Sequence, residues 1–153
     1  MEKVEIMKLD PDAIIPTRGS DEAAGYDLYA LKNTFIEEHT NALIHTGIAM
    51  SIPKGCFGAI FARSGLATKE SLRPANCVGV IDSDYRGEIM VALHNDGGVQ
   101  DDNAKTENVR SIEKYQRIAQ IVFLPYIPVE FEEVSELSDT NRGEGGFGST
   151  GKN

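Results

Sequence analysis

Short apolar runs separated by turn-forming residues make up most of this chain. Some runs alternate apolar with polar positions, as from Val4 to Leu9, and others are almost continuously apolar, as from Ile118 to Leu124. We expect strands over residues 4–9, 24–30, 34–38, 42–52, 56–62, 76–81, 88–93, 116–125 and 127–131. Many short strands bounded by turns favour an all-β sandwich or barrel over a fold that alternates strands and helices.

One segment departs from the strand pattern. Ser64 is a suitable N-cap, helix-favouring residues follow it, and Pro74 ends the segment. We therefore expect one short helix of about two turns over 64–72. Free backbone N–H groups at its start, beside Arg63, would form an anion site. An ordinary capped helix with a solvated arginine accounts for the same residues.

Residues 76–93 have the pattern of a β-hairpin, and its turn holds more charged and aromatic side chains than a turn requires. The arms are apolar and β-rich, while the turn holds Asp82, Asp84, Tyr85 and Arg86 before a glycine. Turns usually need only small polar residues and glycine. We expect the hairpin to present part of a functional site, with either aspartate as a candidate for the chemistry.

Two further segments are polar. Residues 95–113 are acidic and without clear periodicity, so we expect an exposed loop over 96–107, with room for a short hairpin, and a protein-partner surface as the less favoured interpretation. We expect the glycine-rich residues 139–153 to form a flexible arm beyond a body of residues 1–138. The arm contains a formal G-x-G-x-x-G pattern without the strand and helix that a dinucleotide site needs. Arg142 and Phe147 among its glycines suit a phosphate-and-base lid, although a frayed terminus would also account for the composition.

Composition narrows the class of protein. The 153 residues fit one domain, and the net charge of −9 argues against nucleic acid or an anionic membrane as a partner. The only cysteines, Cys56 and Cys77, do not form a disulfide framework, which favours a reducing, cytoplasmic location. An apolar run long enough to span a bilayer is missing, and the N-terminal residues lack the apolar core of a signal peptide.

Five ordered segments together resemble the motifs of the homotrimeric dUTP diphosphatases (dUTPases). They are AGYDL (24–28), RSGLA (63–67), GVIDSDYRG (79–87), RIAQ (117–120) and RGEGGFGSTG (142–151). The resemblance implies a distorted jelly-roll β-barrel that assembles as a homotrimer with active sites shared between subunits. It also implies Mg²⁺-dependent hydrolysis of dUTP to dUMP and pyrophosphate, through attack of water on the α-phosphorus. This activity keeps dUTP low and supplies dUMP for thymidylate synthesis.

The resemblance assigns roles to the hairpin. Asp82 would be the base that orients and deprotonates the water, and Tyr85 would pack beneath the deoxyribose and exclude a 2′-hydroxyl. The hairpin backbone, including Gly79 and Ile81, would read the uracil edge with help from the amide of Asn76.

The resemblance also assigns roles outside the hairpin. Asp27 would serve the Mg²⁺ site through water or through the network around it. The phosphates would be held by Arg63, Ser64, Gly65 and Gln120. The arm would bind the terminal phosphate, cover the uracil and add hydroxyl or backbone donors through Arg142, Phe147, Gly148 and Ser149.

Some residues depart from the family pattern, and three different functions stay open. Ala62 replaces a common proline, Tyr115-Gln116 replaces a common Gly-Asp pair, and the segment after Asn95 is long. A dCTP deaminase shares the fold, but Ala92 stands where its catalytic glutamate would be. The second possibility is a binding protein that uses the dUTPase scaffold and the 95–113 loop. The third is a nucleotide-binding jelly roll of different specificity.

Overall fold

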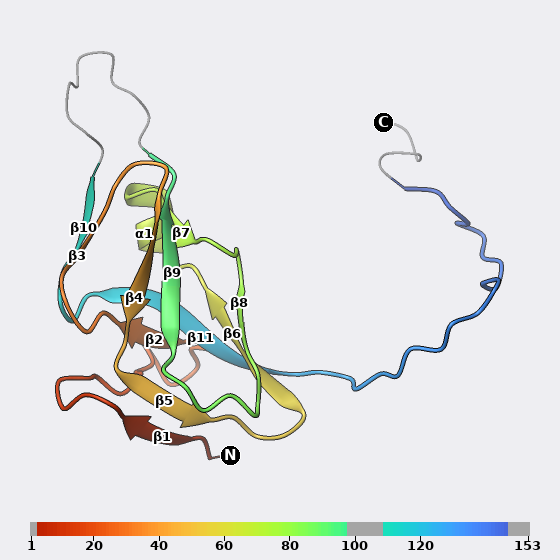
Figure 1. Cartoon of the computed structure of the whole chain (residues 1–153), viewed down its shortest axis with the longest axis horizontal. Coiled ribbons are helices and arrows are strands. Elements are labelled where there is room, and N and C mark those ends of the chain that lie inside the picture. The colour runs from red at the N-terminus through yellow and green to blue at the C-terminus, as the bar shows by residue number, and fades with distance from the viewer. Residues whose placement is uncertain (1–2, 98–108, 147–153) are drawn as a thin grey trace, which may run out of the picture.

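The computed structural model describes residues 3–97 and 109–146. Within these ranges the chain forms eleven strands and one short helix, and the strands are arranged in four antiparallel sheets (Figure 1). The all-β prediction with one helix is therefore confirmed. The sheets form a distorted, jelly-roll-like body that does not close into a continuous barrel. The described helix is far too short to cross a membrane.

The largest sheet contains four strands in the order β2-β11-β6-β8. These are β2 (Tyr26–Tyr29), β11 (Arg117–Pro125), β6 (Cys56–Phe61) and β8 (Gly79–Ile81). The long strand β11 lies inside the sheet, which explains its nearly continuous apolar sequence. Residue 118 interrupts its pairing with β2, because Arg117 lies opposite Tyr29 while Ala119 lies opposite Leu28.

Three smaller sheets complete the body. A three-stranded sheet has the order β4 (Asn41–His45), β9 (Met90–Asn95), β7 (Leu72–Pro74). Strand β1 (Glu5–Lys8) pairs with β5 (Ile48–Ser51), and β3 (Thr34–Ile36) pairs with β10 (Arg110–Ile112). The core lies between the sheets. Its largest fully buried side chains come from all four sheets and, at Ile89, from the connection before β9: Leu28, Ile36, Ile44, Ile48, Ile60, Leu72, Ile89, Val91, Leu93, Ile112, Ile118 and Ile121.

The expected strand over 42–52 is wrong as a single element. The structure divides it into β4 and β5 at Thr46 and Gly47. Gly47 has φ of 70°, a conformation that costs glycine little and disrupts a regular strand. The two halves consequently join different sheets.

The expected helix over 64–72 is shorter and starts differently. Helix α1 covers Ser64–Lys69, and Arg63 occupies the N-cap position without a side-chain cap. Ser64 is therefore the first helical residue and not the cap. Ser71 adopts a positive φ of 54°, which ends the helical path before Leu72 enters β7.

The expected hairpin over 76–93 is not a paired hairpin. Strand β8 pairs with β6, whereas β9 pairs with β4 and β7, so residues 82–89 connect two different sheets. The connection is tied to the β4–β5 break, because the Ile89 N–H donates to the Ile48 carbonyl and the Thr46 hydroxyl donates to the Ile89 carbonyl. These bonds direct the chain away from β8 after the turn.

The C-terminal part of the described chain extends away from the body (Figure 1). The strand expected over 127–131 is absent from the structure, and residues 126–146 contain neither helix nor strand. Ile127 is 84% exposed and Phe131 94% exposed. The boundary at residue 138 stays a prediction, since the extended path already begins after β11.

Residues 98–108 of the acidic segment 95–113 lie outside the described residues. At the two ends of this segment the expectation of an irregular chain is wrong, since Asn95 ends β9 and Arg110–Ile112 form β10, with Asn95 and Ile112 buried.

Candidate active site

Polar side chains from β2, from the start of α1 with its N-cap residue Arg63, and from β11 gather around a small cavity of about 230 Å³. Four of the residues predicted from the sequence line it, namely Asp27, Arg63, Ser64 and Gln120. The remaining lining residues are Gly19, Ala23, Gly25 and Arg117. The body of the fold explains this gathering, because β11 lies between β2 and β6, and Gln120 pairs with Asp27 on one side and with Phe61 on the other.

Two arginines share the carboxylate of Asp27. The Nε–H of Arg63 donates to Oδ1 over 2.8 Å, and Nη1 of Arg117 donates to Oδ2 over 3.3 Å. Nη1 of Arg63 also donates to the carbonyl oxygen of Arg117 over 3.4 Å. The Asp27 side chain is only 14% exposed, so both cations are held against a largely buried anion. Two guanidinium groups against one carboxylate leave one unit of positive charge at the cavity.

The other phosphate-binding candidates lie beside this ion cluster. Nε2 of Gln120 donates to the carbonyl of Ala62 over 2.9 Å, which orients its amide oxygen toward Gly25. Ser64 and Gly65 are exposed at the start of α1. The helix forms its first backbone bond from the Ala67 N–H to the Arg63 carbonyl, so the amides before Ala67 precede the helical ladder.

Metal ligands do not gather in 3–97 or 109–146, where we find no group of three His, Cys, Asp or Glu side chains suited to a metal ion. Both oxygens of Asp27 accept hydrogen bonds from arginines, so this carboxylate does not fit a direct ligand. Mg²⁺ commonly keeps its waters and binds phosphate oxygens with few protein ligands. The role of Asp27 in a metal site through water stays a prediction, and its partners in the structure are cations.

The turn after β8 exposes the predicted catalytic group. Asp82 is exposed directly after Ile81, and its carbonyl accepts the N–H of Tyr85 over 3.2 Å. The Tyr85 hydroxyl donates to the Glu88 carbonyl over 3.1 Å, which fixes the ring across the turn. Gly87 is required under this ring, because any Cβ at that position would overlap the phenol.

Arg86 stabilises the turn internally. Its Nη1 donates to the carbonyls of Ser83 and Tyr85 over 2.7 and 2.8 Å. Both of these hydrogen-bond partners of Arg86 are backbone carbonyl oxygens of its own turn. Arg86 is thus a structural cation and not a phosphate ligand in this conformation.

A second turn precedes β8 and presents the other base-reading candidates. Asn76 is exposed, and its carbonyl accepts the N–H of Val78 over 2.7 Å. Gly79 and Ile81 then lie in β8, paired with Ile60 and Gly58 of β6. Strand β8 is the edge of its sheet, so its outward-facing backbone groups are free of a strand partner and can meet a ligand.

Glu88 anchors the connection between the sheets and was missed in the sequence. Its Oε2 accepts the Nδ1–H of His45 and its Oε1 accepts the N–H of Gly47, both over 2.8 Å. Burial raises the pKa of Glu88, but the hydrogen bonds from His45 and Gly47 outweigh burial, so the pKa lies below its ordinary value of 4.5. The contact spans 43 positions in the chain, which local patterns do not reveal.

The two groups of candidates do not meet within one chain. Strands β6 and β8 are antiparallel, with Gly58 opposite Ile81. Asp82 therefore lies beside the start of β6, whereas Arg63 follows its end. About six residues of extended chain separate these positions, partly in β6 and partly beyond its end. They correspond to about 20 Å, which is too far for both side chains to act on one phosphate group.

The arm contributes little to either group in this conformation. Nε of Arg142 donates to the Gly145 carbonyl over 2.8 Å, within the extended segment itself. Phe147, Gly148 and Ser149 lie outside the described residues. The predicted roles of these four residues stay predictions.

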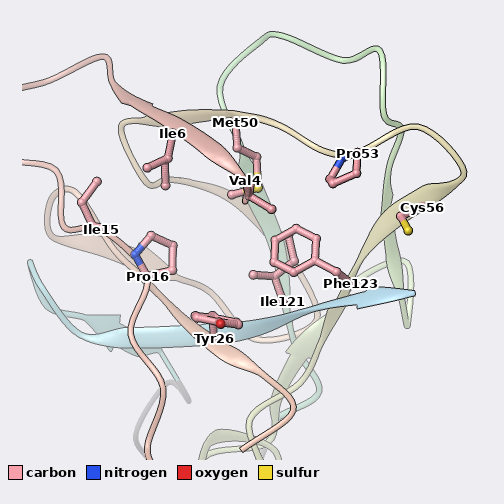
Figure 2. A pocket seen from close by; sticks show the side chains of 10 residues that line it. All are labelled: Val4, Ile6, Ile15, Pro16, Tyr26, Met50, Pro53, Cys56, Ile121 and Phe123. Atoms are coloured by element: carbon pink, nitrogen blue, oxygen red, sulfur yellow. The ribbon is translucent and has the colours of Figure 1, made fainter. Parts of the chain in front are cut away.

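A larger, apolar cavity of about 440 Å³ lies away from the ion cluster. Figure 2 shows Val4, Ile6 and Met50 on one side of it, with Tyr26, Ile121 and Phe123 facing them from β2 and β11. Among the described strands β1 pairs only with β5, so its other edge has no partner there, and Ile6 of β1 lines this cavity. A strand-like apolar segment is the kind of occupant that an open edge and an apolar groove can bind.

Comparison with known sequences gives one consistent family. The dUTPase family model matches residues 11–151. The deoxyuridine 5'-triphosphate nucleotidohydrolase of Nautilia profundicola is 45% identical over 150 residues, covering 98% of this chain and 99% of that protein. The Clostridioides difficile protein of the same name is 40% identical over 151 residues, with 99% of both chains covered.

Solved structures agree with the sequence relatives. A dUTPase variant from Staphylococcus bacteriophage 80alpha, with dUpNHpp, superimposes with a TM-score of 0.87 at 31% identity, covering 99% of this chain and 100% of that chain. A dUTPase variant from phage phi11 of S. aureus, described with a structural Mg(II) ion, gives a TM-score of 0.78 at 25% identity over 88% of this chain and 98% of that chain.

Proposed function

This chain belongs to the dUTPase family and is a dUTP nucleotidohydrolase, and on that premise we propose which of its residues bind and hydrolyse the nucleotide. The observation that carries the proposal is the cluster of Asp27, Arg63 and Arg117 beside Gln120. It is a local excess of positive charge in a chain of net charge −9. A polyanionic substrate therefore binds at this cavity and not elsewhere on an acidic surface.

The triphosphate is held by the cavity. Arg63 offers a planar guanidinium that grips phosphate oxygens, Gln120 offers its amide, and Ser64 and Gly65 offer a hydroxyl and backbone N–H groups. Phosphoryl transfer depends mainly on positioning and on neutralising charge. Mg²⁺ bound to the substrate as Mg·dUTP would neutralise charge on the phosphates, and it would need no cage of protein carboxylates at this site.

The segment around β8 selects the nucleoside and supplies the base. The exposed carboxylate of Asp82 accepts the proton of the attacking water. The ring of Tyr85, fixed by its bond to Glu88 and by Gly87, leaves no room for a 2′-hydroxyl. Asn76 and the free edge of β8 hydrogen-bond the uracil.

A homotrimer brings these two groups together across subunits. Asp82 and Arg63 lie about 20 Å apart in one chain, yet both must act at the same phosphates, so the copies exchange them. The extended C-terminal segment supports association. Its apolar residues Ile127, Val129 and Phe131 have the two-residue spacing of a strand and are strongly exposed. They fit the apolar cavity beside the open edge of β1 on a second copy.

The end of the arm then closes over the nucleotide. Arg142 binds the terminal phosphate, Phe147 covers the uracil, and Gly148 and Ser149 add donors. A protein partner at the 95–113 loop and a cytoplasmic location both stay predictions from the sequence.

Release of pyrophosphate from dUTP, dTTP, UTP and dCTP in the presence of Mg²⁺ tests the proposal. We expect turnover of dUTP alone, and loss of most turnover in Asp82→Asn because asparagine cannot accept the proton. Full activity of Asp82→Asn would overturn its role as the base, and equal turnover of UTP would overturn the role of Tyr85. Formation of a uracil nucleotide from dCTP would instead indicate a deaminase.

A further inference from the structure

Arg117 has no role in the substrate contacts above, although the structure places it in the phosphate cavity. Its Nη1 donates to Oδ2 of Asp27 over 3.3 Å, while Arg63 occupies Oδ1 of the same carboxylate. Its backbone carbonyl accepts a second hydrogen bond from Arg63. Arg117 is therefore linked to Arg63 in two ways: both side chains bind the Asp27 carboxylate, and the Arg63 side chain donates to the Arg117 carbonyl.

A β-bulge explains how Arg117 reaches this position. In a regular strand, residues three apart point to opposite faces of the sheet. Here residue 118 is extra in the pairing with β2, and both Ile118 and Ala119 are buried. Arg117 and Gln120 consequently lie on the same polar face and line one cavity. Bulges re-aim side chains in this way.

The hydrogen bonds define what the cluster can offer a ligand. Asp27 and the Arg117 carbonyl engage Nε and Nη1 of Arg63, and among residues 3–97 and 109–146 its Nη2 has no bond within the protein. An arginine oriented in this way presents its remaining N–H groups in a fixed direction. Without Arg117, Arg63 and Asp27 would form a neutral pair with little attraction for a polyanion.

We propose that Arg117 is a positioning residue for phosphate binding: it holds Asp27, and through it the Arg63 guanidinium, and it supplies the net positive charge of the cavity. This inference rests on the proposed role of the cavity in holding the phosphates of dUTP. Arg117 itself acts through Asp27 and Arg63 and does not touch the reacting atoms.

Steady-state kinetics with Mg·dUTP test this inference. For Arg117→Gln we expect kcat/KM to fall about 10- to 100-fold, mainly through KM, because a charge-assisted contact and a net charge are lost. Arg117→Lys keeps the charge and one donor to Asp27, so we expect it to recover most of the loss. Lys114→Gln is the matched control, since it removes one positive charge from the exposed pair with Asp12, and we expect wild-type kinetics.

A double-mutant cycle separates positioning from a merely structural role. If Arg117 acts largely by holding Asp27, Arg117→Gln lowers kcat/KM by a smaller factor in an Asp27→Asn background than in the wild-type background. Equal losses in both backgrounds, an Arg117→Gln variant within about twofold of wild type, or a failure of lysine to rescue would each overturn the inference. Arg63→Gln separates the phosphate site from the role of Arg117. Full activity of Arg63→Gln would overturn the phosphate site itself. An inactive Arg63→Gln together with a fully active Arg117→Gln would overturn only the role of Arg117.

Discussion

The amide oxygen of Gln120 lies where a side chain at position 25 would begin, since a Cβ on Gly25 would be 2.6 Å from Oε1. We expect Gly25→Ala to displace this amide from the phosphate cavity. The displacement should lower kcat/KM for dUTP about tenfold, the equivalent of one hydrogen bond to a charged group. A crystal structure of the variant would show the rotated amide.

Gly19→Ala is the control for added bulk at the same cavity. A Cβ there meets nothing within 4 Å, so we expect Gln120 to keep its position. If both variants lose activity equally, the contact between Gly25 and Gln120 is not the cause.

Sugar discrimination should depend on the ring of Tyr85. We expect Tyr85→Ala to narrow the preference for dUTP over UTP, measured as the ratio of kcat/KM values, by roughly tenfold or more. Tyr85→Phe retains the ring and loses only the bond to the Glu88 carbonyl, so its preference should stay near wild type. An unchanged preference in Tyr85→Ala would assign the discrimination to another group.

Subunits that carry complementary defects should restore each other. We expect Asp82→Asn and Arg63→Gln proteins to be inactive alone and to recover activity when refolded together, since mixed assemblies contain sites with both native residues. Refolding Asp82→Asn with the Asp82→Asn/Arg63→Gln double variant is the control and should remain inactive. Absence of recovery in the first mixture would indicate that one chain forms the whole site.

Stability should depend on pH through Glu88. Its pKa lies below 4.5, so its contribution to the free energy of unfolding is full above that pH and is lost as the pH falls through the folded-state value. At neutral pH we expect Glu88→Gln to lower the free energy of unfolding by about 1 kcal/mol. The difference from wild type should shrink below pH 4.5, in denaturant titrations at one protein concentration.

Glu37→Gln serves as the control for loss of a carboxylate. Glu37 is exposed, and the Thr40 hydroxyl contacts it only through its backbone carbonyl. A pH-dependent difference as large in Glu37→Gln as in Glu88→Gln would contradict a specific effect of the bonds to His45 and Gly47.

Two truncations should separate assembly from catalysis. Ending the chain after Thr140 keeps the apolar segment and removes Phe147, so we expect an intact trimer with greatly reduced turnover. Ending it after Pro125 also removes Ile127 and Phe131, and we expect the mass in sedimentation equilibrium to fall toward that of one chain. A trimer that survives the shorter truncation would show that other surfaces are sufficient for association.

Local patterns in the sequence predicted most of the strands and several of the side chains that line the phosphate cavity. Turn-forming or polar residues flank the runs at β1, β2, β6 and β11, and their boundaries differ from expectation by at most two residues. The family motifs indicated Asp27, Arg63 and Gln120, which do meet at one cavity. The pairing of strands was less accessible, because Gly79–Ile81 looks equally suited to β9 and to β6 in sequence alone.

Features that depend on contacts across the fold were missed. The bond between His45 and Glu88 spans 43 positions, and a charge in a connection gives no local signal of its partner. The apolar residues from Ile127 to Phe131 alternate like a strand, but within the described residues of the same chain they have no strand partner. Period-two alternation also hid Arg117, since it places that side chain on the face opposite Gln120.

The bulge in β11 shifts the alternation of side chains between the two faces by one residue, so the two ends of the strand do not share one alternation pattern. From Gln120 onward, the pairing with β6 determines which face each side chain points to. At Arg117 the alternation is shifted by one residue. The one extra residue in this strand therefore determines which side chains face the cavity as much as the identity of those residues does. Without the bulge, the spacing of three positions between Arg117 and Gln120 would place the two side chains on opposite faces of the strand and turn a cation toward the core.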